Sequence, residues 1–165
     1  LVGFPYPTVA GVQGSCLGGG LELVLACGIV IAEDGATLAS PEIQLGVLAP
    51  AATALLPTRV AEDVLLTGRS LTADDGLRLG MVSLVVPEGG LDEAVDTFVD
   101  THFVPRSAHS LRLATRAVRG QRQVEVGERL DEAERLYVEE LLPTHDGVEG
   151  IRAFMEKRPP QWRNC

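Results

Sequence analysis

The sequence predicts an α/β fold that changes into an all-helical region over its last third. Up to about residue 90, short apolar runs rich in β-branched residues alternate with helix-like runs. This pattern is typical of strands that are buried on both faces. From Leu91 onward, apolar residues recur at helical spacing instead. We therefore expect an α/β core over residues 1–90 and a helical region over residues 91–165.

The first predicted elements are two buried strands on either side of a glycine-rich turn. Thr8–Val12 and Gly28–Ala32 are continuous apolar runs, as expected for buried strands. Between them, Gly18–Gly20 precedes an apolar helix that ends near Ala26. Consecutive glycines pack nothing and cost backbone entropy. The turn is therefore expected to be a place where another group approaches the main chain closely.

Shorter elements complete the predicted core. Thr37–Ala39 is a third strand, and prolines bracket a short helix over Ala49–Pro57. Another short helix is expected over Ala61–Leu66, and Thr72 is the expected N-cap of the next one. The run Met81–Val86 predicts a last strand, which a proline–glycine turn ends.

Helices account for the rest of the chain. Apolar spacing, glycines and prolines predict four of them: Leu91–His102, Arg106–Arg119, Val124–Leu142 and Gly147–Lys157. Arg112, Arg116 and Arg119 share one face of the second helix. We expect that face to be solvated or to contact another subunit.

Composition narrows the classes of function. The chain has 165 residues, which suits one domain, and its 14 basic against 23 acidic residues give a net charge of −9. This charge disfavours nucleic acid or an anionic membrane as a partner. Cys16, Cys27 and Cys165 are odd in number and lack metal-ligand spacing, so we expect reduced thiols, no bound metal and a cytoplasmic location. The three histidines show no catalytic pattern.

Two glutamates stand where acid–base chemistry is possible. Glu22 lies among apolar residues in the first turn of the helix after the glycines, and Glu42 follows Pro41 directly after a short strand. Glu22 alone could be a partner of the helix dipole, and Glu42 alone a loop carboxylate. Together they are candidates for acid–base work on one water. The unpaired N–H groups at the helix start could hold a developing oxyanion.

Several short motifs occur in a fixed order along the chain. They are Pro7–Gly14, Gly18–Leu23, Ala26–Cys27, Ser40–Gly46, Leu66–Arg69 and Leu77–Val82. From about Pro7 to the C-terminus, the chain resembles the enoyl-CoA hydratase/isomerase (crotonase) family. The resemblance implies a crotonase-like spiral core of the ClpP/crotonase type, whose N-terminal part we expect to be missing from this sequence. It also implies a C-terminal helical region that builds homotrimers, often paired as homohexamers.

The resemblance also implies roles for individual residues. Glu22 and Glu42 match the two catalytic glutamates, and Gly19 matches an oxyanion-hole donor. The second donor belongs to an earlier segment that this sequence does not contain. Five positions are expected to contact the substrate: Gly18, Gly20, Pro41, Phe154 and Lys157. Of these, Phe154 and Lys157 match residues that reach the adenine and phosphates of CoA, often in a neighbouring subunit.

Family members hydrate or isomerise acyl-CoA thioesters, so the implied partner is an acyl-CoA and no further cofactor is needed. Val47–Pro57 and Glu149–Pro159 resemble the cyclic dienoyl-CoA hydratases, which act on cyclohexa-1,5-diene-1-carbonyl-CoA. Activity on linear enoyl-CoA, as hydratase or isomerase, remains an alternative, and so does a non-catalytic acyl-CoA-binding or assembly module. Two departures stand out. Gly28 replaces a common aspartate, and members usually carry a few more residues between Val60 and Ala61.

Overall fold

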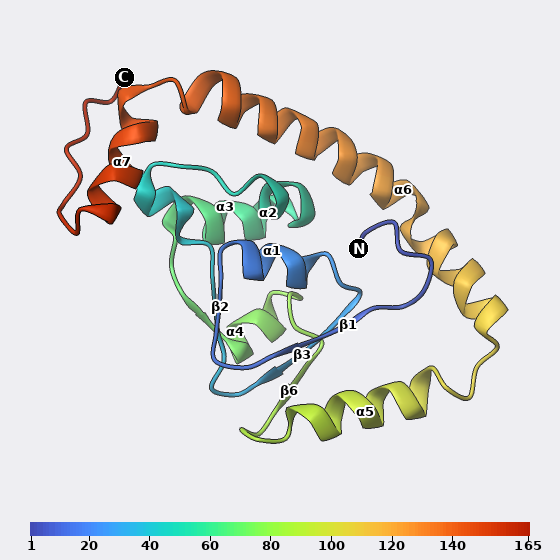
Figure 1. Ribbon diagram of the computed structural model, residues 1–165. Coiled ribbons are helices and arrows are strands. Elements are labelled where there is room, and N and C mark those ends of the chain that lie inside the picture. The colour runs from blue at the N-terminus through green and yellow to red at the C-terminus, as the bar shows by residue number, and fades with distance from the viewer.

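Two small sheets form the core of the molecule, which the computed structural model describes over residues 1–165 (Figure 1). One sheet is fully parallel, in the order β1 (Val9–Val12), β3 (Ile29–Glu33), β6 (Leu84–Val86). In the other sheet a parallel pair is followed by an antiparallel strand: β2 (Ser15–Leu17), β4 (Thr37–Ala39), β5 (Leu71–Thr72). The chain passes from β1 to β2 and again from β3 to β4. Each such passage adds one strand to each sheet, so the core winds as a spiral.

Helices surround this spiral. Those of the core are α1 (Gly19–Leu25), the 3₁₀ helix η1 (Pro41–Leu45), α2 (Pro50–Leu55), α3 (Thr58–Thr67) and α4 (Ala73–Arg78). Those of the last third are α5 (Leu91–His102), α6 (Ala108–Arg135), the π-helical turn η2 (Leu136–Leu141) and α7 (His145–Met155). The predicted capping residue Thr72 is confirmed, because its side chain and that of Asp75 bind each other's backbone N–H groups.

Apolar side chains from both sheets and the short helices meet in one core. Leu21 of α1 and Val64 of α3 are completely buried, and Leu38 and Leu71 are 1% exposed. Leu21 lies one residue before Glu22, so its burial fixes the rotation of α1 and hence the direction of the glutamate. Cys16 also packs against this core. Burial raises the pKa of its thiol, which favours the protonated, unreactive form.

Several expectations differ from the observed elements. The helices α3 and α7 begin before the predicted Ala61 and Gly147, and the two-residue strand β5 was not expected. The predicted strand Met81–Val86 is shorter, because the N–H groups of Met81 and Val82 instead bind the carbonyl of Gly76 and close α4. The strand β2 was not expected at all. The helices predicted over Arg106–Arg119 and Val124–Leu142 are one continuous helix, α6. A Cβ on Gly120 would meet nothing within 4 Å, and one exposed glycine costs a helix only about 1 kcal/mol.

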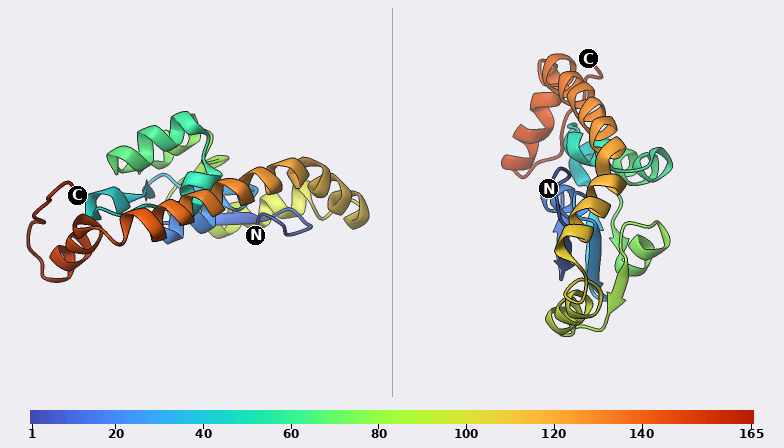
Figure 2. Two further views of the ribbon diagram at one scale, coloured as in Figure 1. Left: turned by 90° about the horizontal axis from the view of Figure 1, so that it is seen from above. Right: turned by 90° about the vertical axis from the view of Figure 1, so that its right-hand side faces the viewer.

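The long helix α6 runs along one side of the molecule and passes the N-terminal segment (Figure 2). Arg119 of α6 donates hydrogen bonds to the carbonyls of Leu1, Phe4 and Tyr6. The prediction that Arg119 faces solvent or another subunit is therefore wrong, because this arginine anchors its own chain. A Cβ on Gly28 would lie 2.8 Å from Arg119 Nη2, so glycine there makes room for the guanidinium.

No helix combines the length and the apolar character that a membrane crossing requires. The helix α3 is continuous through Val60 and Ala61. All three cysteines are free.

Candidate active site

The glycine turn joins the end of β2 to the start of α1. Gly18 has φ +54° and ψ −125°, a combination that L-residues with a side chain avoid. Its N–H donates to the carbonyl of Ala39 at the end of β4, at 2.9 Å. Gly19 and Gly20 open α1, and a Cβ on either would meet nothing within 4 Å. The N–H groups of a first helical turn have no carbonyl one turn earlier in the helix.

Glu42 lies directly against this turn. Pro41 is the first residue of η1, whose opening places Glu42 near β4. The Ser40 hydroxyl donates a hydrogen bond of 2.7 Å to Glu42 Oε2, and Ser40 is only 1% exposed. The other oxygen, Oε1, lies 2.6 Å from the point where a Gly18 side chain would begin. The structure therefore brings together Gly18 and Glu42, which the sequence holds apart.

Glu22 occupies the first turn of the same helix. Its N–H donates to the carbonyl of Gly18 at 3.0 Å. Its carboxylate oxygen Oε1 accepts a hydrogen bond of 3.0 Å from the N–H of Ala52 in α2. The protein thus orients one oxygen of each glutamate, through Ala52 for Glu22 and Ser40 for Glu42. Glu22 Oε2 and Glu42 Oε1 accept no hydrogen bond from the protein, so both are available to a bound molecule.

Two arginines of α6 hold the helix that orients Glu22. Arg129 donates to the carbonyls of Thr53 and Leu56, and Arg122 donates to the carbonyl of Leu55. These carbonyls end α2 and lack partners within the helix, so the cations satisfy them and complement the helix dipole. The position of Ala52, and through it of Glu22, therefore depends on α6.

A cavity of about 200 Å³ adjoins Glu42. Its wall is mostly apolar and comes from η1, the segment before α2, and α3: Ser40, Glu42, Ile43, Val47, Leu48, Ala49, Thr53, Thr58, Ala61, Glu62, Leu65, Leu66 and Arg129. Glu22 and the three glycines are not part of this wall. A larger cavity of about 350 Å³ lies near the other end of α1, beside Cys27 and Arg122. It contains none of the predicted site residues.

The remaining predicted residues lie elsewhere on the chain. Phe154 is 67% exposed near the end of α7, and Lys157 follows that helix with φ +53°. Neither lines the cavity beside Glu42. The structure therefore brings Glu42 and Pro41 to Gly18, and Glu22 follows Gly18 by one turn of α1, but Phe154 and Lys157 do not line the cavity beside Glu42.

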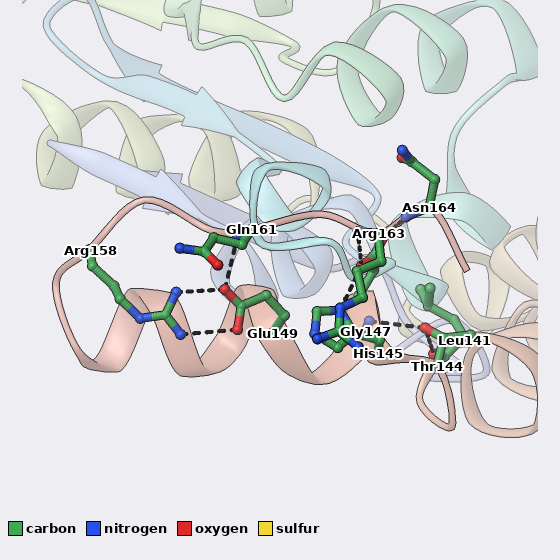
Figure 3. Close-up of polar contacts among 10 residues, drawn as sticks. Leu141, Thr144, His145, Gly147, Glu149, Arg158, Gln161, Arg163 and Asn164 are labelled. Carbon is green, nitrogen blue, oxygen red and sulfur yellow. Dashed lines mark hydrogen bonds and ion pairs between the residues drawn. The ribbon is translucent and has the colours of Figure 1, made fainter.

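The segment after α7 folds back along that helix (Figure 3). Glu149 is 5% exposed; it forms an ion pair with Arg158 and accepts the N–H of Gln161 at 2.9 Å. These contacts lower the pKa of Glu149 to about 2, the Arg158 hydrogen bonds contributing most. Asp146 accepts the N–H groups of Arg163 and Asn164, at 2.8 and 2.7 Å. These bonds, with His145, also lower the pKa of Asp146.

Sequence reasoning missed the groups that orient the glutamates. Ser40 was visible as a hydroxyl two residues before Glu42, a spacing that allows a local hydrogen bond. No sequence signal could have found the Ala52 N–H or Arg129, because their contacts join segments far apart in the chain.

Comparison with known proteins gives a consistent result. The enoyl-CoA hydratase/isomerase family matches residues 1–164. The cyclohexa-1,5-dienecarbonyl-CoA hydratase of Thauera aromatica is 43% identical over 97% of this chain and 63% of its own length. A probable enoyl-CoA hydratase of Mycobacterium bovis is 40% identical over 94% of this chain and 62% of its own. The chain thus spans somewhat less than two thirds of these relatives.

Solved structures agree with the sequence comparison. The crystal structure of a carnitinyl-CoA hydratase from Mycobacterium avium superposes with a TM-score of 0.87 at 35% identity, covering 98% of this chain and 64% of that one. The predicted crotonase-like fold and the predicted resemblance are both confirmed. The chain belongs to the enoyl-CoA hydratase/isomerase family.

Proposed function

We propose that this protein is a hydro-lyase that adds water to the conjugated double bond of an enoyl- or dienoyl-CoA thioester. The observation that carries the proposal is the position of Glu42 against Gly18, at the start of the helix that bears Glu22. One carboxylate therefore lies against the turn, and a second belongs to the first turn of the helix that the glycines open. Hydration of a thioester-activated double bond needs these groups, because it moves two protons and builds up negative charge on the thioester oxygen.

In the proposed reaction, the Gly19 N–H donates to the thioester oxygen, with Gly18, Gly20 and Pro41 packed against the substrate. Negative charge collects on that oxygen as water adds, and a well-placed donor there is worth about 3–4 kcal/mol. Because backbone N–H groups stabilise this negative charge on the thioester oxygen, the proposed reaction needs no metal or redox cofactor.

Glu22 and Glu42 hold the water between their free oxygens. One ionised glutamate takes a proton from the water as its oxygen forms a bond to the β-carbon of the substrate. The other glutamate, protonated at the start, gives its proton to the α-carbon. One C–O and one C–H bond form and the double bond is lost, so the balance is one added water. The two glutamates exchange protonation states, which proton transfer with solvent resets.

We propose cyclohexa-1,5-diene-1-carbonyl-CoA as the substrate. The similarity to the Thauera hydratase supports a cyclic acyl group. The compact apolar cavity beside Glu42 also suits a ring, with Leu48, Ala61 and Leu65 in its wall. A linear enoyl-CoA is the second candidate, because the Mycobacterium bovis relative is named a probable enoyl-CoA hydratase. A non-catalytic binding module is disfavoured, since binding alone has no use for two separately oriented carboxylates.

The proposal includes a cytoplasmic location and assembly into a homotrimer or homohexamer, and the helical region supports the assembly. Val148, Phe154 and Met155 leave large apolar areas of α7 exposed. Phe154 and Lys157 lie outside the cavity of their own chain, and we propose that they contact the CoA of a neighbouring copy. Sedimentation equilibrium measures the assembly, and a monomer at micromolar concentration would contradict it.

The test of the activity is a spectrophotometric hydration assay on the full-length chain, including the segment expected to carry the second oxyanion donor, that compares cyclohexadienoyl-CoA with crotonyl-CoA. We expect a higher kcat/KM for the cyclic substrate. Glu42→Gln should lower kcat by about 100-fold or more and leave KM nearly unchanged, because it removes acid–base function but keeps the shape. Glu88→Gln, in an exposed turn, is the matched control and should keep full activity. A Glu42→Gln enzyme with normal kcat would remove the acid–base assignment.

A further inference from the structure

The last residues of the chain are attached to α7 through their backbone. Asp146 accepts hydrogen bonds from two consecutive backbone N–H groups, those of Arg163 and Asn164. Glu149 accepts the N–H of Gln161 (Figure 3). The Arg158 guanidinium adds a two-pronged ion pair to Glu149. Because the acceptors are charged, these bonds are stronger than neutral ones. We call residues 158–164 the strap.

The strap places one large side chain between two elements. Trp162 lies between Gly46, at the end of η1, and Gly150 in α7. A Cβ on Gly46 would lie 2.9 Å from the Trp162 ring, and a Cβ on Gly150 would lie 2.8 Å from it. Gly150 also approaches the Leu45 carbonyl so closely that no side chain would fit there. The indole therefore rests on the bare backbone of η1 where η1 packs against α7.

The element that Trp162 contacts is the one that carries Glu42. Gly46 ends η1 in a left-handed conformation, φ +67°, and its N–H binds the Ile43 carbonyl. The next N–H, that of Val47, binds the carbonyl of Glu42 itself at 3.1 Å. A shift of Gly46 therefore moves the backbone of Glu42. It would disturb the 2.7 Å bond from Ser40 and the contact of the carboxylate with Gly18.

We infer that Trp162 is a positioning residue, which the strap holds on Gly46 so that the Glu42 carboxylate stays against the glycine turn. This inference rests on the proposed function, in which Glu42 moves a proton. None of these strap contacts involves Glu22 or the glycines at positions 18–20. Its effect on catalysis passes through η1 alone, and it should therefore alter turnover more than substrate binding.

The first experiment tests whether the strap is held as described. Trp162 is the only tryptophan of the chain, so its fluorescence reports on its own surroundings. The double variant Asp146→Asn with Glu149→Gln should shift Trp162 emission to longer wavelength and increase quenching by acrylamide, while far-UV circular dichroism stays unchanged. The control Glu156→Gln breaks only an exposed contact with Arg158 and should change neither. Unchanged emission in the double variant would show that Asp146 and Glu149 do not hold the strap on α7.

The second experiment tests the link to Glu42 with the hydration assay. We expect Trp162→Ala to lower kcat by about tenfold or more with KM within about twofold, since a misplacement of about 1 Å can cost about 100-fold. Trp162→Phe keeps a flat ring on Gly46 and should restore most of the turnover. A loss that Phe does not restore, or a fall in kcat and melting temperature together, would reduce Trp162 to a structural role.

The two proposals fail in different ways. If the unmodified full-length chain hydrates none of the acyl-CoA substrates, the proposed function is wrong and the positioning role falls with it. The fluorescence result still decides whether the strap is held against α7. If the unmodified protein is active and Trp162→Ala turns over normally, the proposed function stands and the positioning role is overturned.

Discussion

Replacing Gly18 with alanine perturbs the site at the point where the two motifs meet. The new Cβ would start 2.6 Å from Glu42 Oε1, well inside van der Waals contact. The carboxylate is the end of a flexible side chain, so it can rotate away. Doing so breaks the hydrogen bond from Ser40 and removes Glu42 from the turn. We expect Gly18→Ala to fold but to lose most of its turnover.

The size of the effect has two parts. The backbone of Gly18, at φ +54° and ψ −125°, costs an alanine about 1–3 kcal/mol, and the lost hydrogen bond adds about 1 kcal/mol. The free energy of unfolding should therefore fall by about 2–4 kcal/mol, the sum of these two terms. Loss of a positioned acid–base group lowers kcat by about 100-fold to 10,000-fold. The variant should thus stay folded while its kcat falls by orders of magnitude.

Gly14→Ala is the matched control. Gly14 also has a positive φ, +62°, but a Cβ there would meet nothing within 4 Å. It should lose about 1–2 kcal/mol of stability and keep normal turnover per folded molecule. Urea unfolding measures the stability, and the hydration assay under conditions where each variant is folded measures kcat. If Gly18→Ala and Gly14→Ala have equal kcat, then Glu42 does not act from its place on Gly18.

Three further predictions concern single residues. Ser40→Ala should lower kcat with little change in KM, because Glu42 loses the donor that orients it, and Ser40→Thr should recover part of the activity; equal kcat in Ser40→Ala and the parent would contradict this. Glu149 has a pKa of about 2, below its ordinary 4.5, so its contribution to stability is present above about pH 4.5 and is lost as the pH falls toward 2. Urea midpoints of the parent and of Glu149→Gln should accordingly differ at neutral pH and converge in acid, and a constant gap would refute the assignment. Lys157→Ala should raise KM for the CoA ester more than it lowers kcat, and a change in kcat alone would argue against a phosphate contact.

Much of the architecture follows from local signals. The helix Leu91–His102 has the predicted bounds, and so has the strand Thr37–Ala39. The Thr72 cap is also observed where it was expected, because capping is decided within four residues. The prediction failed where a local signal was too weak to decide. Gly120 does not end α6, because one exposed glycine only weakens a helix. The contacts of Arg122 and Arg129 with α2 hold the part of α6 that follows it.

The sequence by itself determined the family, through the order of its motifs, and it predicted the candidate site residues in the glycine turn and the two glutamates. It could do so because each motif is short and its residues are neighbours in the chain. Only the tertiary structure decided how these side chains are oriented and which groups they contact. Glu42 meets Gly18, Glu22 meets the Ala52 N–H, and Trp162 rests on Gly46. Each of these contacts depends on how separate elements pack, which no local pattern encodes.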